Sequence, residues 1–145
     1  MGANRDLMDR LTRLVFTDRN IEAYADCLAA DAVVVTPDEG EVRGRDAIID
    51  YMRRFMDAFP DARYELTHAF ESADGAADEG YFIGTQTGPL ATASGKSTPA
   101  TGKEVRVRSS DAITVEGGLV KAHRLYYDLM DMFNQLGLSP SKALA

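Results

Sequence analysis

The sequence predicts an α+β fold in a single domain of 145 residues. Up to Pro60, apolar residues recur mostly at helical spacing, and after Pro60 they alternate as in β-strands. Helices grouped ahead of such strands favour an antiparallel sheet rather than a parallel one with crossover helices. From this order of elements we expect a cone, in which three helices close a strongly curved sheet around a pocket.

The N-terminal part contains three predicted helices and one strand. The spacing of apolar residues indicates helices near residues 7–15, 21–28 and 46–59. Pro60 ends the last of them, because proline cannot donate the next helical hydrogen bond. The β-branched run Ala32–Val35, stopped by Pro37, predicts a strand, and residues 38–44 predict a polar turn.

The C-terminal part predicts four strands and a final helix. The strands are expected near residues 64–71, 79–87, 104–115 and 119–128. Residues 72–78 are expected to form a turn, and Gly117–Gly118 is a two-residue hairpin signal. Residues 88–102 are small, polar and rich in glycine and proline, which predicts a long loop of the kind that often binds ligands. A helix is expected near residues 129–136, followed by a loose tail at 139–145.

The last two strands carry acids on faces that are otherwise apolar. Residues two apart on a strand share a face. In the first strand the predicted inner row is Val105, Val107, Ser109, Asp111, Ile113 and Val115; in the second it is Val120, Ala122, Arg124, Tyr126 and Asp128. Burying a carboxylate without a partner costs several kcal/mol, on the order of an unpaired charge. Asp111 and Asp128 therefore predict a pocket rather than a plain core.

Composition excludes several classes of function. The net charge of −7 argues against a nucleic acid or an anionic membrane as partner. No apolar stretch approaches the roughly 20 residues that span a bilayer. The single cysteine, Cys27, fits a reducing cytoplasm, so we expect a cytoplasmic location. Two histidines and no HExxH or CxxC motif leave no predicted metal site, and no cofactor motif is present.

Several motifs resemble the SnoaL-like polyketide cyclases. They are GTQTGPL (84–90), the PATGKEV segment (99–105), and SSDAITVEGGLVKAHRLYYDLMDMFNQLGL (109–138). The segment ADAVVVTPDEGEVRGRDAI (30–48) also fits the superfamily of nuclear-transport-factor-2-like proteins, to which those cyclases belong. This resemblance implies a cystatin-like α+β barrel and a homodimer.

The resemblance also implies roles for individual residues. In the family, an aspartate at the end of the last strand is the acid/base of an intramolecular aldol condensation, and Asp128 matches it. The family's aspartate on the preceding strand matches Asp111. Two positions depart from the pattern, since Gln86 and Tyr126 stand where cyclases often have histidine.

Both acids also have a structural interpretation. Asp128 precedes the final helix, where aspartate is a favoured N-cap, and Asp131 follows three residues later. Asp111 could form an ion pair with Arg124, which could equally hold a substrate oxygen. Tyr126 could donate to a developing oxyanion or to the backbone.

Other candidates for the pocket are more ambiguous. His68 lies among apolar residues, which fits either substrate binding or a satisfied core histidine. Gln86 could line the pocket, and Tyr51 and Phe55 fit either a ligand wall or ordinary helix packing. His123 falls on the predicted polar face of its strand and is expected to be solvated.

The leading hypothesis is a cofactor-independent enzyme acting on a small apolar carbonyl compound, with an aromatic polyketide as the favoured class. Asp128, Asp111 and Tyr126 would be catalytic, and Arg124, His68, Gln86, Tyr51 and Phe55 would bind the substrate. The alternatives are a cofactor-free hydroxylase, dehydratase or isomerase, and a non-catalytic module for ligand binding or dimerisation.

Overall fold

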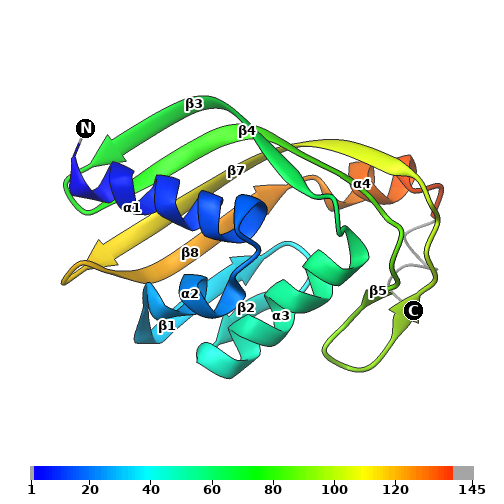
Figure 1. The fold of residues 1–145 in the computed structure, drawn as a ribbon, viewed down its shortest axis with the longest axis horizontal. Coiled ribbons are helices and arrows are strands. Elements are labelled where there is room, and N and C mark those ends of the chain that lie inside the picture. Colours follow the sequence, from blue (N-terminus) through cyan, green and yellow to red (C-terminus); the bar gives the residue numbers. More distant parts are fainter. Residues whose placement is uncertain (1, 139–145) are drawn as a thin grey trace.

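A six-stranded curved sheet arches over the N-terminal helices (Figure 1). The computed structural model describes residues 2–138, so the predicted loose tail lies outside the described residues. The strand order is β2-β1-β8-β7-β4-β3. The strands are β1 (Leu28–Thr36), β2 (Gly40–Arg43), β3 (Arg63–Ser72), β4 (Gly75–Thr85), β7 (Glu104–Glu116) and β8 (Leu119–Tyr127). The predicted α+β class is therefore confirmed.

One pairing in this sheet differs from the antiparallel arrangement that we expected. Strands β1 and β8 run parallel, whereas the other neighbouring strands are antiparallel. This parallel pairing joins the start of the sheet to its end, so it depends on contacts between distant segments that alternation does not encode.

The helices pack beneath the arch of the sheet or at its end (Figure 1). They are α1 (Ala3–Thr12), α2 (Ile21–Asp26), α3 (Arg45–Ala58) and α4 (Leu129–Gln135). Helix α1 runs into one π-helical turn, η1 (Arg13–Thr17), in which the amide of Asp18 donates to the carbonyl of Arg13 at 2.9 Å. Asn20 then starts α2, because its side chain accepts from the amide of Ala23 at 3.0 Å.

The turn predicted at 72–78 is shorter than expected. β4 begins at Gly75, which leaves only Ala73 and Asp74 between β3 and β4. Asp78, the last residue of the predicted turn, lies buried in β4 with a carboxylate oxygen 2.6 Å from Nη2 of Arg5. Pairing with an arginine from α1 is what allows an acid inside this strand.

The predicted loop at 88–102 is mostly irregular and contains one small hairpin. Its two strands are β5 (Leu90–Ala91) and β6 (Ser97–Thr98). The predicted polar turn at 38–44 likewise contains β2. At the hairpin between β7 and β8, Gly117 and Gly118 have φ angles of 61° and 78°, as the predicted two-residue turn requires.

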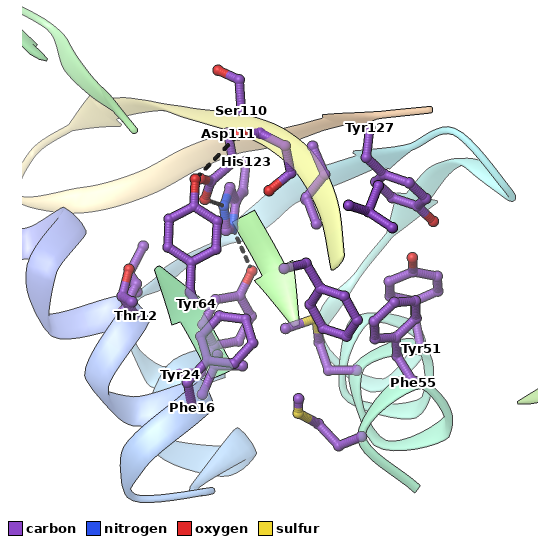
Figure 2. Close-up of a pocket in the computed structure, with 18 of the residues that line it drawn as sticks. Thr12, Phe16, Tyr24, Tyr51, Phe55, Tyr64, Ser110, Asp111, His123 and Tyr127 are labelled. Carbon is purple, nitrogen blue, oxygen red and sulfur yellow. Dashed lines mark hydrogen bonds and ion pairs between the residues drawn. The ribbon is translucent and has the colours of Figure 1, made fainter. Parts of the chain in front are cut away.

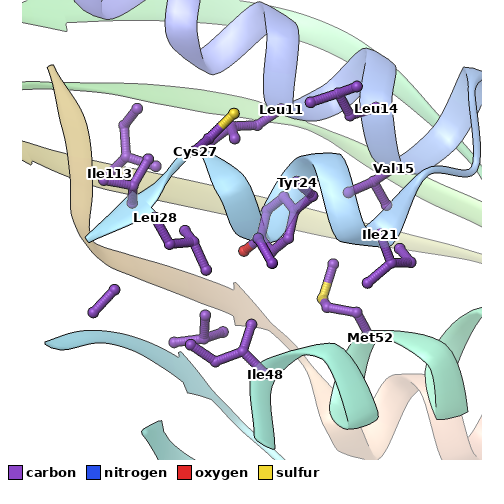
Figure 3. Close-up of a cluster of buried hydrophobic side chains, with 14 of the residues drawn as sticks. Leu11, Leu14, Val15, Ile21, Tyr24, Cys27, Leu28, Ile48, Met52 and Ile113 are labelled. Atoms are coloured by element: carbon purple, nitrogen blue, oxygen red, sulfur yellow. The ribbon is translucent and has the colours of Figure 1, made fainter. Parts of the chain in front are cut away.

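The larger core cluster lies between the helices and the inner face of the sheet (Figure 3). Its members come from α1, η1, α2, α3 and the facing strands, and those labelled in the figure are Leu11, Leu14, Val15, Ile21, Tyr24, Cys27, Leu28, Ile48, Met52 and Ile113. Among residues 2–138, no helix has both the length and the apolar character needed to cross a bilayer.

Candidate active site

A mostly apolar cavity lies between the N-terminal helices and the inner face of β7 and β8 (Figure 2). Its volume is about 90 Å³. Aromatic side chains form much of the wall; they are Phe16, Tyr24, Tyr51, Phe55, Tyr64, Phe82 and Tyr127. The rings of Phe55 and Phe82 meet edge to face, with centroids 5.2 Å apart. This lining favours a small, largely apolar ligand.

A chain of three polar side chains enters this cavity from three different elements. The hydroxyl of Tyr24, on α2, lies 2.8 Å from Nδ1 of His123 on β8. The other ring nitrogen, Nε2, lies 2.7 Å from Oδ2 of Asp111 on β7. Tyr24 is fully buried, the side chain of His123 is 8% exposed and that of Asp111 is 21% exposed. Asp111 is therefore the member of the chain most open to a ligand.

Strand register places Asp111 and His123 together. In the antiparallel pair of β7 and β8, Asp111 lies opposite Leu125, and Ile113 lies opposite His123. His123 is thus a diagonal neighbour of Asp111 on the same face, a separation that a long side chain spans. Because both residues belong to the central strands of the sheet, their geometry is set by a rigid part of the fold.

The state of Tyr24 determines where the imidazole proton lies. Burial, together with the nearby Asp111 carboxylate, raises the pKa of Tyr24, so its hydroxyl keeps its proton at neutral pH. Because the carboxylate of Asp111 can only accept, we assign the imidazole proton to Nε2, which donates to Asp111, and the hydroxyl of Tyr24 then donates to Nδ1. Among the described residues, Oδ1 of Asp111 has no hydrogen-bond partner, and it can accept a proton from a ligand.

Three of the predicted site residues do line this cavity. They are Asp111, Tyr51 and Phe55. The partner of Asp111 is His123 rather than the predicted Arg124. Tyr51 donates to Oδ1 of Asp38 at 3.0 Å, while Phe55 packs between Tyr51 and Phe59.

Asp128 and Tyr126 are not where the predicted roles require them. Asp128 is exposed and lies outside the cavity wall, and its side chain accepts from the amide of Asp131 at 3.0 Å. It is therefore the N-cap of α4, as the structural interpretation of this residue predicted. Tyr126 is 56% exposed and does not reach the cavity.

Three predicted substrate-binding residues also lie outside the cavity. Arg124 donates to the hydroxyl of Thr114 at 3.0 Å. The side chain of His68 is 68% exposed and lies 3.6 Å from Glu79. Gln86 is fully buried, but its amide binds the long loop by accepting from the hydroxyl of Thr101 at 2.8 Å.

Two residues of the hydrogen-bonded chain were not predicted for the site. Tyr24 was placed only on the apolar face of the helix predicted near residues 21–28, where it is indeed buried, whereas His123 was expected to be solvated and is buried instead. A bulge in β8 explains the error for His123. Val120 pairs with Val115 and Ala122 pairs with Thr114, so Lys121 is an extra residue in β8. Before this bulge the even-numbered residues of β8 point inward, and after it the odd-numbered residues do. In residues 2–138, no three His, Cys, Asp or Glu side chains are grouped as metal ligands would be.

Comparison with known proteins identifies a family. The family model of the SnoaL-like domain matches residues 8–123. A comparison with curated proteins gives no match.

Solved structures share the fold at low sequence identity. TsrD from Streptomyces laurentii is 23% identical with a TM-score of 0.76, covering 94% of this chain and 96% of its own. A protein from Jannaschia sp., proposed to be a SnoaL-like polyketide cyclase, is 16% identical with a TM-score of 0.77. The match covers 97% of this chain and 98% of that protein. A protein from Catenulispora acidiphila with a ketosteroid isomerase-like fold, in complex with trimethylamine, is 19% identical with a TM-score of 0.74. The match covers 92% of this chain and 94% of that protein. These similarities establish the fold.

Proposed function

Because this chain belongs to the SnoaL-like domain family, we propose that it is a cofactor-independent enzyme that moves a proton next to a carbonyl group of a small, largely apolar compound. The observation that carries this proposal is the row of hydrogen-bonded side chains Tyr24–His123–Asp111, which ends in a carboxylate on the wall of an apolar cavity. A positioned carboxylate in such surroundings is suited to general acid–base catalysis.

Each of these three hydrogen-bonded residues has a defined part in this mechanism. Oδ1 of Asp111 takes a proton from the carbon next to the carbonyl, and an enolate forms. The Nε2 proton of His123 holds Oδ2 and fixes the orientation of the carboxyl group. Tyr24 keeps the imidazole in the tautomer that can do so. In an isomerisation, Asp111 returns the proton to a different carbon of the enolate. In a ring closure, the enolate carbon attacks a second carbonyl carbon, and the alkoxide that forms takes the proton back from Asp111.

Within this class, we propose an intramolecular aldol condensation of a polyketide-like substrate. The family and the proposed cyclase from Jannaschia sp. favour this reaction. The second candidate is a ligand-binding module without catalysis, which the exposed position of Asp128 favours, since that residue matches the family's acid/base and here only caps a helix. The homodimer, the cytoplasmic location and the small-molecule partner remain predictions.

The experiment follows exchange of protons next to the carbonyl of 1-indanone, a bicyclic ketone, in deuterated buffer by NMR. We expect the wild-type protein to accelerate exchange over buffer alone. General acid–base catalysis contributes about 10²- to 10⁴-fold, so the substitution Asp111→Asn should remove at least about 100-fold of the rate. Binding of 1-indanone without any acceleration would reject the enzyme and favour the binding module.

A further inference from the structure

The cavity adjoins a second hollow beneath the long loop. This groove has a volume of about 370 Å³ and lies between the β5–β6 hairpin, α4 and the segment that contains Asp38. Phe55, Tyr127 and Met132 line both hollows. These three side chains therefore form the junction between the apolar cavity and the more polar groove.

One polar atom at this junction is not satisfied by the protein. The hydroxyl oxygen of Tyr127 is buried and makes no well-aligned hydrogen bond to the described residues, although the hydroxyl of Tyr51 and the carboxylate of Asp38 lie close to it. The nearby hydroxyl of Tyr51, which faces it in Figure 2, instead donates to Asp38 at 3.0 Å. Burial, with the Asp38 carboxylate adding to it, raises the pKa of Tyr127, so the group is a phenol and can donate. A buried hydroxyl without a well-aligned partner lowers stability, and a ligand acceptor would recover that loss.

Register relates Tyr127 to the proposed base. Leu125 lies opposite Asp111, and Tyr127 lies opposite Ser109, two residues before Asp111 on the same face. Tyr127 and His123 are thus the two diagonal neighbours of Asp111, about 7–8 Å away along the sheet. A ligand lying over Leu125 would have the carboxylate of Asp111 on one side and the phenol of Tyr127 toward the groove.

We propose that Tyr127 donates a hydrogen bond to the carbonyl oxygen of the ligand and thereby selects small cyclic ketones over hydrocarbons of the same shape. This inference rests on the proposed function for the position of the reacting carbon, and it adds the group that holds the oxygen. As Asp111 removes the proton, negative charge grows on that oxygen, where the donor strengthens its bond. A ligand without the oxygen leaves the hydroxyl unpaired and is rejected.

The test compares two ligands that differ only by the oxygen, 1-indanone and indane. Their dissociation constants are measured by NMR titration with the wild-type protein and with Tyr127→Phe. We expect the substitution to weaken binding of 1-indanone about tenfold, the effect of losing one hydrogen bond, and to leave binding of indane within about twofold. Equal weakening of both ligands, no weakening of 1-indanone, or no binding of 1-indanone to the wild-type protein would overturn the proposal.

Tyr64 offers a matched control. It also lines the cavity, but its hydroxyl already donates to the carbonyl of Ser109 at 3.2 Å. Tyr64→Phe should leave unchanged the ratio of the dissociation constant of indane to that of 1-indanone. A drop in this ratio as large as the drop in Tyr127→Phe would overturn the assignment. Because Asp111→Asn should still bind 1-indanone, binding reports on Tyr127 and proton exchange reports on the proposed catalysis.

Discussion

Nε2 of His123 lies 2.7 Å from Oδ2 of Asp111, and this contact joins two neighbouring antiparallel strands, β8 and β7. The contact connects a carboxylate on the cavity wall to a fully buried tyrosine, Tyr24. An imidazole held at both nitrogens cannot rotate without losing two hydrogen bonds. The pair is therefore pre-organised for moving a proton at one place in the cavity.

The substitution Tyr24→Phe tests the assigned tautomer. It removes the donor to Nδ1 while keeping the ring that fills the core, so the imidazole proton is no longer confined to Nε2. We expect ketone exchange to slow by about fivefold to tenfold, as for the loss of one hydrogen bond. In ¹⁵N NMR spectra, the wild-type protein should show a protonated Nε2 and an unprotonated Nδ1 on His123. A wild-type spectrum with the proton on Nδ1 would contradict the assignment.

The substitution Asp128→Ala tests the capping role of this residue. Loss of an N-cap typically lowers the free energy of unfolding by about 1 kcal/mol. We expect that loss in urea denaturation, with proton exchange at the wild-type rate, because Asp128 lies outside the cavity. Asp128→Asn is the matched control, since asparagine caps helices as well as aspartate does. Unchanged stability in Asp128→Ala would show that the cap contributes nothing.

The substitution Arg5→Met tests the buried ion pair between α1 and β4. It leaves the carboxylate of Asp78 buried without its cation, and breaking such a pair costs about 3–5 kcal/mol. Burial raises the pKa of Asp78 even beside Arg5, so the folded state binds this proton more tightly than the unfolded chain does. The stability of the variant is therefore retained at low pH and lost as pH rises through that raised pKa. The loss relative to the wild-type protein should be smaller in acid than at neutral pH.

A double variant provides the control for that prediction. Arg5→Met combined with Asp78→Leu removes both charges and should recover most of the free energy of unfolding at neutral pH. A deficit in Arg5→Met that does not change with pH, or a double variant as unstable as the single one, would assign the loss to packing instead.

The sequence predicted the fold because each main element carries a local signal. Apolar periodicity identified the three N-terminal helices, Pro60 marked the end of one of them, and Gly117–Gly118 marked the final hairpin. The predicted SnoaL-like family is also confirmed. The parallel pairing of β1 with β8 was missed, because it depends on long-range contacts.

The site was predicted only in part, and strand bulges explain most of the difference. The residues of β7 that share a face with Asp111 were correctly predicted to point inward, because β7 pairs with β4 without a bulge. On β8 the extra residue Lys121 exchanges the faces, so His123 points inward and Tyr126 outward. On β3 a register shift between Leu66 and His68 turns His68 outward in the same way. An alternating pattern cannot locate a bulge when both faces carry apolar residues.

The proposed function assigns the role of base to Asp111 rather than to Asp128. The most direct measurement compares the rate of 1-indanone proton exchange in Asp111→Asn with that in Asp128→Asn, both checked for folding by thermal unfolding. We expect a loss of at least about 100-fold for Asp111→Asn and a wild-type rate for Asp128→Asn. A wild-type rate in Asp111→Asn, or the large loss in Asp128→Asn instead, would contradict it.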